Sequence, residues 1–352
     1  MAALDVSVEK NLRGFSLDLS FRAGERGCLG ILGGSGCGKS MTLRSIAGIE
    51  TPGRGRITLG ERVLYDSAQG IDLPPQKRRV GYLFQSCALF PNLTVEQNIT
   101  AGLRGCSQRE KAETAARMVE KFRLSGLEDR YPRQLSGGQQ QRVALGRILA
   151  CSPEVLLLDE PFSALDAYLR EELLLELSQT LAEYQGISIL VTHSREEAFR
   201  LCGELLVMDR GRCSAFGETK ALFRSPGTLQ AARLTGCRNL ARAEKGEGNT
   251  LRVPEWNVSL TPGRPIPEGT AYVGIRSRDL HPAGEGEENR LPLLDPLVME
   301  GPARDQVVFR PGEGAARLWW EPGGRTAPGS LPRELAVRPE DLLLLTEQTG
   351  SR

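Results

Sequence analysis

The sequence predicts an α/β domain over residues 1–235, followed by a small, mostly β domain over residues 236–352. In the first part, short apolar runs rich in β-formers alternate with segments of helical periodicity, as in α/β folds. After about residue 236, Gly and Pro become dense and the apolar runs become short, which is typical of an all-β module with many turns. A chain of 352 residues is long enough for two domains of ordinary size.

The first domain begins its α/β pattern with a buried strand at 26–34, a turn, and a helix at 39–48. Between about residues 105 and 150 the pattern becomes helical, and strand character returns afterwards. The other expected elements are strands at 55–60, 78–85, 153–161 and 187–193, helices at 107–124, 139–150 and 167–184, and a hairpin at 203–217.

Two segments of the second domain resemble each other. "GIRSRDLHP" at 274–282 and "AVRPEDLLLL" at 336–345 each have a small apolar lead-in, an Arg, and then an Asp-Leu step. Such self-similarity favours a duplicated β unit.

Composition and charge exclude several classes of protein. The net charge is +1 and the pI is about 7.5, so the basic surplus typical of duplex-binding proteins is absent. The first ten residues contain no apolar signal region, and apolar runs such as "VLLL" at 155–158 are far shorter than the ~18 residues of a membrane span. The eight Cys have no metal-site spacing, so we expect reduced thiols.

A glycine-rich loop follows the first buried strand. "GGSGCGKS" at 33–40, the phosphate loop, fits G-x-x-x-x-G-K-[ST] and opens a helix, whose N-terminus favours anions. Glycines let backbone N–H groups approach a polyphosphate closely. Lys39 is expected to bridge the β- and γ-phosphates of ATP, and Ser40 to bind Mg²⁺. The expected ATP-binding residues are Gly33, Gly34, Ser35, Gly36, Cys37, Gly38, Lys39, Ser40 and Met41.

Two carboxylates follow a buried strand in "VLLLDE" at 155–160. A strand buried on both faces ends in Asp-Glu when its tip meets something charged, and ligands of α/β sheets bind at such strand ends. We expect Asp159 to hold Mg²⁺ through water and Glu160 to act as the general base for the attacking water.

A second glycine-rich turn lies in "LSGGQQQR" at 135–142, which we call the signature segment. It opens a helix and can therefore bind an anion, but no second Lys-Ser pair or metal carboxylate accompanies it. The segment is therefore expected to contact the ATP of a second copy of the chain, packed head to tail. The residues expected to act on the partner's nucleotide are Ser136, Gly137, Gly138 and Gln139.

The phosphate loop, the signature segment, "VLLLDEPFSALD" and "VTHS", in this order, resemble the nucleotide-binding subunit of an ABC transporter. The resemblance covers about residues 4–235. It implies an α/β P-loop fold with a RecA-like core and a helical subdomain at about 86–150. It also implies a C-terminal all-β domain, an OB-like barrel of the TOBE/Mop type, with ATP and Mg²⁺ as cofactors.

The resemblance implies further roles at matching positions. Gln85 corresponds to the glutamine that senses Mg²⁺ and the γ-phosphate, so the implied metal ligands are Ser40, Gln85 and Asp159. His193 corresponds to the switch histidine, which contacts the γ-phosphate and supports Glu160. "SALD", the D-loop, is implied at the dimer seam and consists of Ser163, Ala164, Leu165 and Asp166. The family places an aromatic on an early loop to stack on adenine. The matching region here, "EKNLRGF", departs from that pattern and offers Leu12 or, with a shift, Phe15, so no residue is assigned to this contact.

The segment "SCALFPNLTVEQNITAGL" at 86–103 is similar to the part of importer ATPases that touches membrane subunits. Alternatively, Leu89 and Phe90 pack within the helical subdomain. The importer resemblance implies three kinds of partner: a second copy, two integral-membrane permease subunits, and indirectly an external substrate-binding protein. It places the chain peripherally at the cytoplasmic face of the cell membrane, with no nucleic acid.

The segment "VLYDSAQGIDLPPQKRRVGYLFQ" at 63–85 resembles molybdate-type ATPases, and "TGCRNLARAE" resembles the entry to their β-barrel module. We expect an oxyanion as cargo, with molybdate or tungstate first; the alternatives are sulfate, ferric iron, polyamine or sugar. The tail could bind the oxyanion through Arg276, Ser277 and Arg278, or could be purely structural.

A rival class is a non-transport ABC ATPase that acts in DNA repair or on ribosomes. Such proteins carry two cassettes or a long coiled-coil insertion, whereas only 97 positions separate Lys39 from Ser136 (136 − 39). A regulator with a decayed ATPase is disfavoured because every catalytic position is filled.

Overall fold

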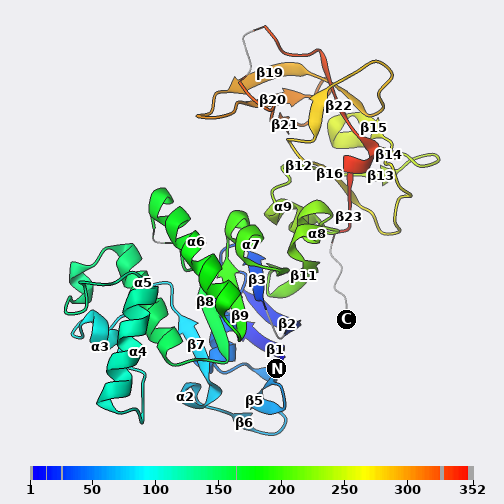
Figure 1. Cartoon of the computed structure of the whole chain (residues 1–352). Helices are drawn as coiled ribbons and strands as arrows, with labels where there is room; N and C mark the ends of the chain where they lie inside the picture. The colour runs from blue at the N-terminus through cyan, green and yellow to red at the C-terminus, as the bar shows by residue number, and fades with distance from the viewer. Residues whose placement is uncertain (1–2, 13, 25–26, 164, 326–328, 348–352) are drawn as a thin grey trace. The chain divides into compact units, whose positions relative to one another are not determined.

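The computed structural model describes residues 3–12, 14–24, 27–163, 165–325 and 329–347, and the chain divides into two compact units, 1–219 and 220–352 (Figure 1). The second unit thus includes nearly all of helix α8 (Thr219–Arg224) and helix α9 (Leu229–Leu234). The sequence-based division at 235/236 lies after these helices. They group with the second unit because the buried Arg276 donates to the carbonyls of Phe223 and Thr235.

The central sheet of the first unit has the strand order β11-β10-β3-β9-β8-β7. All neighbouring pairs are parallel except β10 and β11. Strands β3, β8 and β9 are buried along their whole length, as their near-continuous apolar sequences predict. The strands are β3 (Cys28–Gly33), β7 (Val80–Leu83), β8 (Val155–Asp159), β9 (Ile187–Thr192), β10 (Glu204–Asp209) and β11 (Arg212–Glu218).

A second, antiparallel sheet in this unit has the order β2-β1-β4-β5-β6. Its apolar side chains join those of the central sheet and of helix α1 (Lys39–Ala47) in one core that includes Ile31, Leu43, Ile57 and Leu157. This core supports the strand-to-helix turn that carries the phosphate loop. The strands are β1 (Leu4–Leu12), β2 (Phe15–Ala23), β4 (Arg54–Leu59), β5 (Arg62–Asp66) and β6 (Ile71–Asp72).

Helices α3, α4 and α5 contact one another and lie together at one side of the first unit (Figure 1). They fall within the segment 86–150 that the resemblance assigns to a helical subdomain. Among the described residues, none of the helices has the length and apolar character needed to span a membrane. The helices are α1 (Lys39–Ala47), α2 (Pro75–Arg78), α3 (Val95–Thr100), α4 (Gln108–Lys121), the 3₁₀ turn η1 (Pro132–Gln134), α5 (Gly137–Ala150), α6 (Ala167–Glu183) and α7 (Arg195–Leu201).

The second unit contains three-stranded antiparallel sheets around a core that includes Trp256 and Phe309, which confirms the predicted β-rich domain. Its described sheets have the orders β12-β16-β23, β13-β14-β15, β17-β22-β18 and β19-β20-β21. The elements are β12 (Asn239–Arg242), β13 (Glu244–Lys245), β14 (Leu251–Val253), η2 (Pro254–Trp256), β15 (Val258–Leu260), β16 (Tyr272–Ile275), β17 (Leu280–Pro282), β18 (Arg290–Pro292), β19 (Leu294–Met299), β20 (Gln306–Arg310), β21 (Leu318–Trp320), β22 (Glu334–Val337), η3 (Pro339–Asp341) and β23 (Leu343–Leu345).

The two similar segments of this unit pair with each other reciprocally. Strand β16 of the first pairs with β23 of the second, and β17 pairs with β22. Each segment turns in the same way, since Asp279 N–H donates to the Arg276 carbonyl and Asp341 N–H to the Arg338 carbonyl, both at 3.0 Å. This equivalence of turn and pairing agrees with a duplicated β unit.

Candidate active site

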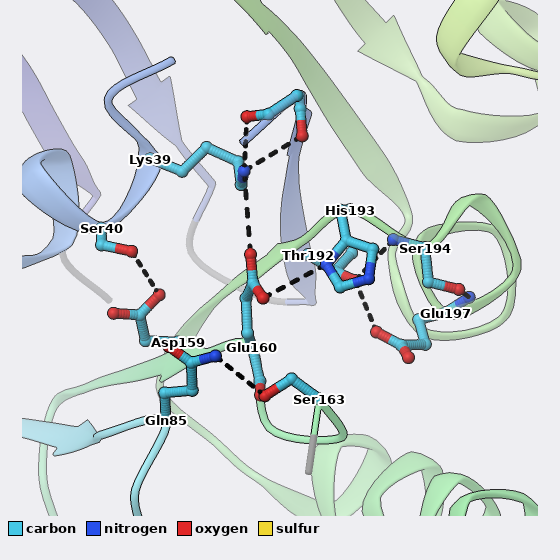
Figure 2. A network of polar contacts seen from close by, with 12 residues as sticks. Lys39, Ser40, Gln85, Asp159, Glu160, Ser163, Thr192, His193, Ser194 and Glu197 are labelled. Carbon is cyan, nitrogen blue, oxygen red and sulfur yellow. Dashed lines mark hydrogen bonds and ion pairs between the residues drawn. The ribbon is translucent and has the colours of Figure 1, made fainter. Parts of the chain in front are cut away.

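The phosphate loop wraps around the ammonium group of Lys39, the first residue of α1 (Figure 2). Lys39 is only 5% exposed, and its Nζ donates to the carbonyls of Gly33 at 3.0 Å and Gly34 at 2.9 Å. The same Nζ lies 3.8 Å from Glu160 Oε1. The loop therefore holds a buried positive charge at the carboxyl end of β3, where an anionic ligand of the sheet would bind.

The glycines of this loop have specific steric roles. Gly36 and Gly38 have φ of 75° and 109°, a region that side chains other than glycine rarely adopt. A Cβ on Gly33 would lie 2.6 Å from Cys37 Sγ, whereas the space beside Gly34 and Gly36 is open. Since the first N–H groups of α1 have no partner within the helix, the loop suits a phosphate chain.

Of the two candidates for the adenine contact, Phe15 lies beside the phosphate loop. Its ring atom Cε2 is 3.4 Å from the position that a Cβ on Gly38 would take. The side chain of Leu12 lies outside the described residues.

Asp159, the last residue of β8, accepts two hydrogen bonds. Ser40 Oγ donates to Oδ1 at 2.8 Å, and the Tyr82 hydroxyl donates to Oδ2 at 2.7 Å. Burial and the neighbouring Asp159 raise the pKa of Tyr82, so the phenol remains a donor. The sequence did not single out Tyr82; strand β7 brings it there because it pairs in parallel with β8.

Glu160 follows β8 in a left-handed conformation with φ of 45°, which is strained for a residue with a side chain. Its N–H donates to the Val191 carbonyl of β9 at 3.0 Å, which fixes the backbone in this conformation. Its Oε2 lies 3.2 Å from Nδ1 of His193 (Figure 2). The carboxylate is thus held between the Lys39 ammonium and the imidazole.

Gln85 is brought to the D-loop. Its Nε2 donates to Ser163 Oγ at 3.2 Å, and Ser163 Oγ donates to the Glu160 carbonyl at 3.0 Å. Gln85 is therefore linked to Glu160 through Ser163, and the hydrogen bond described for it does not run to Ser40 or Asp159. Asp166 caps α6, Leu165 packs against the helical core, and Ala164 lies outside the described residues.

The signature segment forms the start of α5 and makes only local hydrogen bonds there. Ser136 Oγ accepts from Gln139 N–H at 3.3 Å, and Gln139 Oε1 accepts from Ser136 N–H at 2.9 Å. A Cβ on Gly138 would lie 2.8 Å from Leu169 of α6, which explains that glycine, while Gly137 is exposed. Within the described part of the chain, no hydrogen bond or ion pair links these residues to the Lys39–Glu160 network.

All eight cysteines are free thiols. Burial raises the pKa of the Cys37 thiol in the phosphate loop, although the charge of Lys39 opposes this. The thiols of Cys28 and Cys202 are buried 3.6 Å apart. None of these groups enters the polar network of Figure 2.

Residues 16–163 match the family model of the ABC transporter. The chain is 40% identical over 246 residues to an Fe(3+) ions import ATP-binding protein of Haemophilus influenzae, covering 69% of this chain and 68% of that protein. It is 44% identical to a sulfate/thiosulfate import ATP-binding protein of Chromobacterium violaceum, covering 74% and 69%. It is 39% identical to a molybdenum import ATP-binding protein of Rhodospirillum rubrum, covering 66% of each.

Solved structures share the fold over 62% of this chain. One is a dimeric ATP-binding cassette in a post-hydrolysis state bound to ADP and Pi, with a TM-score of 0.53, 26% identity and 98% of its chain covered. Another is a subunit of an ABC transporter complex from Clostridium perfringens, with a TM-score of 0.56, 28% identity and 90% covered. These similarities confirm the fold class predicted from the sequence.

Proposed function

Since this chain belongs to the ABC transporter family and is the ATP-binding, energy-coupling subunit of an importer, we propose that it hydrolyses ATP to move an oxyanion. The observation that carries the ATPase proposal is the convergence of Lys39, Glu160 and His193 at one edge of the central sheet. A buried cation, a carboxylate and an imidazole within one network suit phosphoryl transfer to water.

In this reaction, Lys39 neutralises the charge of the β- and γ-phosphates, exchanging its bonds to the loop carbonyls for bonds to phosphate oxygens. Glu160 accepts a proton from the attacking water, since a carboxylate within reach of the γ-phosphate can act as general base. His193 orients that carboxylate through Nδ1, and its imidazole is the group we assign to the γ-phosphate when ATP is bound.

The residues around Asp159 fit a Mg²⁺ ion. Mg²⁺ prefers oxygen ligands, and the Ser40 hydroxyl and the Asp159 carboxylate lie 2.8 Å apart beside the phosphate loop. Mg²⁺ would neutralise charge that develops on the β- and γ-phosphates. Tyr82 orients Asp159 through its other oxygen. Gln85, 3.2 Å from Ser163, remains our third proposed ligand.

The site is proposed to be complete only in a pair of chains. Ser136 to Gln139 offer a helix N-terminus that is not used by the chain's own network. The helix is preorganised by its capping box, so it can present N–H groups to the γ-phosphate on the partner. A related cassette is dimeric in its post-hydrolysis state, which supports this arrangement.

We propose that the segment 86–103 contacts the permease subunits at the cytoplasmic face of the membrane. Phe90 is 50% exposed, although it belongs to an apolar run. Arg147 of α5 lies over its ring at 5.3 Å and donates to the carbonyls of Ala88 and Cys87 at 2.8 and 3.0 Å. An exposed aromatic held in place by a helix is typical of an interface anchor.

Replacing Phe90 by Asp is expected to abolish co-purification with the permease subunits, because a charge would replace the apolar anchor. The matched control is Phe216→Asp on β11, where the aromatic is exposed to a similar degree. Co-purification is measured after co-expression with the permease genes. Equal recovery of both variants would contradict the role of this segment.

Molybdate is the cargo that the segment 63–85 favours. In the structure this segment forms β5 and β6, joined by a turn in which Asp66 Oδ1 accepts the N–H groups of Ala68 and Gln69. The names of the relatives span ferric iron, sulfate, molybdenum and spermidine/putrescine, so they do not select one cargo. The "V-L-x-D-S" element at 63–67 is the feature that favours molybdate among them. In the second unit, Arg276 binds backbone carbonyls, which favours a structural role for it.

The cargo is tested by uptake of labelled molybdate into vesicles that contain the chain, its permease subunits and the external binding protein. We expect ATP-dependent molybdate uptake that a Lys39→Ala variant loses. Labelled sulfate and ferric iron serve as competitors in the same assay. Uptake of one of these with no molybdate uptake would reject molybdate while leaving the importer function intact.

A further inference from the structure

Glu197 is a buried carboxylic acid that the proposed reaction does not use. It lies in the first turn of α7, is 5% exposed, and its Oε2 accepts a hydrogen bond from Thr192 Oγ1 at 2.5 Å (Figure 2). Carboxylates are rarely buried to this extent unless they are paired and have a specific role.

Thr192, the last residue of β9, connects the carboxylate of Glu197 to the backbone N–H of Ser194, the residue that follows His193. Its Oγ1 accepts the N–H of Ser194 at 2.9 Å while its proton goes to Glu197. Ser194 Oγ in turn accepts the N–H of Glu197 at 3.4 Å. These three bonds form a closed loop among Thr192, Ser194 and Glu197 that links the end of β9 to the start of α7 (Figure 2).

The imidazole of His193 is not held by packing. Its side chain is 60% exposed, and the hydrogen bond described for it runs from Nδ1 to Glu160 Oε2. The rotamers open to an exposed side chain depend on the conformation of its backbone. Thr192 and Ser194 are the residues on either side of it, so the closed loop fixes the direction in which the ring leaves the backbone.

We propose that Thr192 and Glu197 are positioning residues that hold His193 toward Glu160. This inference rests on the proposed role of His193 and Glu160 in ATP hydrolysis. Thr192 acts through its hydroxyl, which must both donate and accept, and Glu197 acts as the acceptor of the hydroxyl proton. The hydrogen bonds among Thr192, Ser194 and Glu197 thus fix the backbone that carries the exposed imidazole.

The surroundings of Glu197 indicate which variants separate positioning from charge. Burial raises the pKa of its carboxyl, and the hydrogen bond from Thr192 and the charge of Arg170 oppose this shift. When folding raises the pKa of an acid, the folded protein becomes less stable as the pH rises above the pKa that the acid has in the unfolded chain. Glu197→Gln removes the charge and keeps an acceptor oxygen, so it should not lower the melting temperature at neutral pH.

The test compares two pairs of variants in the full chain. Thr192→Val keeps the shape of the side chain and removes the hydroxyl, whereas Thr192→Ser keeps the hydroxyl. Glu197→Leu removes the acceptor, whereas Glu197→Gln keeps it. We expect Thr192→Val and Glu197→Leu to lower kcat about 10- to 100-fold with little change in KM, because small misplacement of a catalytic group has effects of this size. The conservative variants Thr192→Ser and Glu197→Gln should retain most of the wild-type kcat.

A spectroscopic readout reports the imidazole directly. The sequence contains two His, and His281 lies in the second domain, so a His281→Gln background leaves His193 as the only histidine signal. We expect its ¹⁵N shifts to show the Nδ1–H tautomer, since Nδ1 lies 3.2 Å from Glu160 Oε2 and an ionised carboxylate can only accept. In Thr192→Val they should move to the mixed tautomers of a free imidazole, and Thr192→Ser should reverse the change.

A double variant, Thr192→Val with Glu197→Leu, covers the case in which either single change prevents folding. Removing both partners of the Thr192–Glu197 bond leaves neither side chain with an unpaired polar group, so folding should survive while kcat stays low, although the N–H of Ser194 also loses its acceptor. The inference is overturned if a folded Thr192→Val or the double variant keeps wild-type kcat and His193 shifts. It is also overturned if Thr192→Ser and Glu197→Gln lose as much kcat as Thr192→Val and Glu197→Leu. If His193→Ala and Glu160→Gln also keep wild-type turnover, the proposed function itself fails.

Discussion

Glu160→Gln is expected to lower kcat for ATP hydrolysis by about 10²- to 10⁴-fold, the contribution of a positioned general base. The amide keeps the shape of the side chain but cannot accept the proton of the attacking water. ATP binding should survive because Lys39 keeps its place in the phosphate loop. The variant should therefore accumulate as an ATP-bound dimer, measured by single-turnover hydrolysis and by size-exclusion chromatography with ATP.

The matched control is Glu196→Gln. Glu196 is a neighbouring carboxylate on α7 that pairs with Arg200 at the surface, away from the network around Lys39. The Glu196→Gln variant should hydrolyse ATP at the wild-type rate. Normal turnover in Glu160→Gln would refute Glu160 as the base.

Ser136→Arg is expected to abolish ATP hydrolysis while each chain still binds ATP. The hydrogen bonds of Ser136 stay within the first turn of α5, so its loss should leave the phosphate loop of the same chain intact. In the proposed pair, a long charged side chain at the start of that helix would block the approach to the partner's γ-phosphate. Removing one preorganised set of donors costs about 10²- to 10³-fold in kcat, and we expect at least that loss.

Mixing this variant with Lys39→Ala separates the two halves of the site. Each mixed pair contains one composite site with an intact phosphate loop and an intact signature segment, and one site that lacks both. Partial activity should therefore return on mixing, although each variant alone is inactive. Full activity from Ser136→Arg alone would rule out a site shared between chains.

The sequence predicted the groups of the site wherever a local motif placed them at the end of a strand. Lys39 and Ser40 follow β3, Asp159 and Glu160 end and follow β8, and His193 follows β9. Because parallel strands present their carboxyl ends at one edge of a sheet, these motifs could be expected to converge. The observed contacts among Lys39, Glu160 and His193 follow from that rule.

Other features depend on strand order and on packing, which local patterns do not report. Tyr82 reaches Asp159 only because β7 is the neighbour of β8, and "VGYLF" gives no sign of it. Thr192 and Glu197 read as an ordinary strand end and an acidic first helical turn. Their bond forms because α7 turns back toward the end of β9.

The domain boundary was likewise beyond local patterns. Residues 220–235 have helical sequences like those of the first domain, and the change in composition comes only after them. They group with the second unit through Arg276, which is far away in the sequence. Such a long-range contact is visible only in the folded chain.

The idea that neither chain can act alone is tested most directly by measuring ATP turnover per chain as the wild-type protein is diluted. Analytical ultracentrifugation in the same buffer gives the fraction of paired chains. We predict that turnover per chain falls in parallel with that fraction and approaches zero when only single chains remain. Constant turnover at concentrations where no pairs are detected would contradict the shared site.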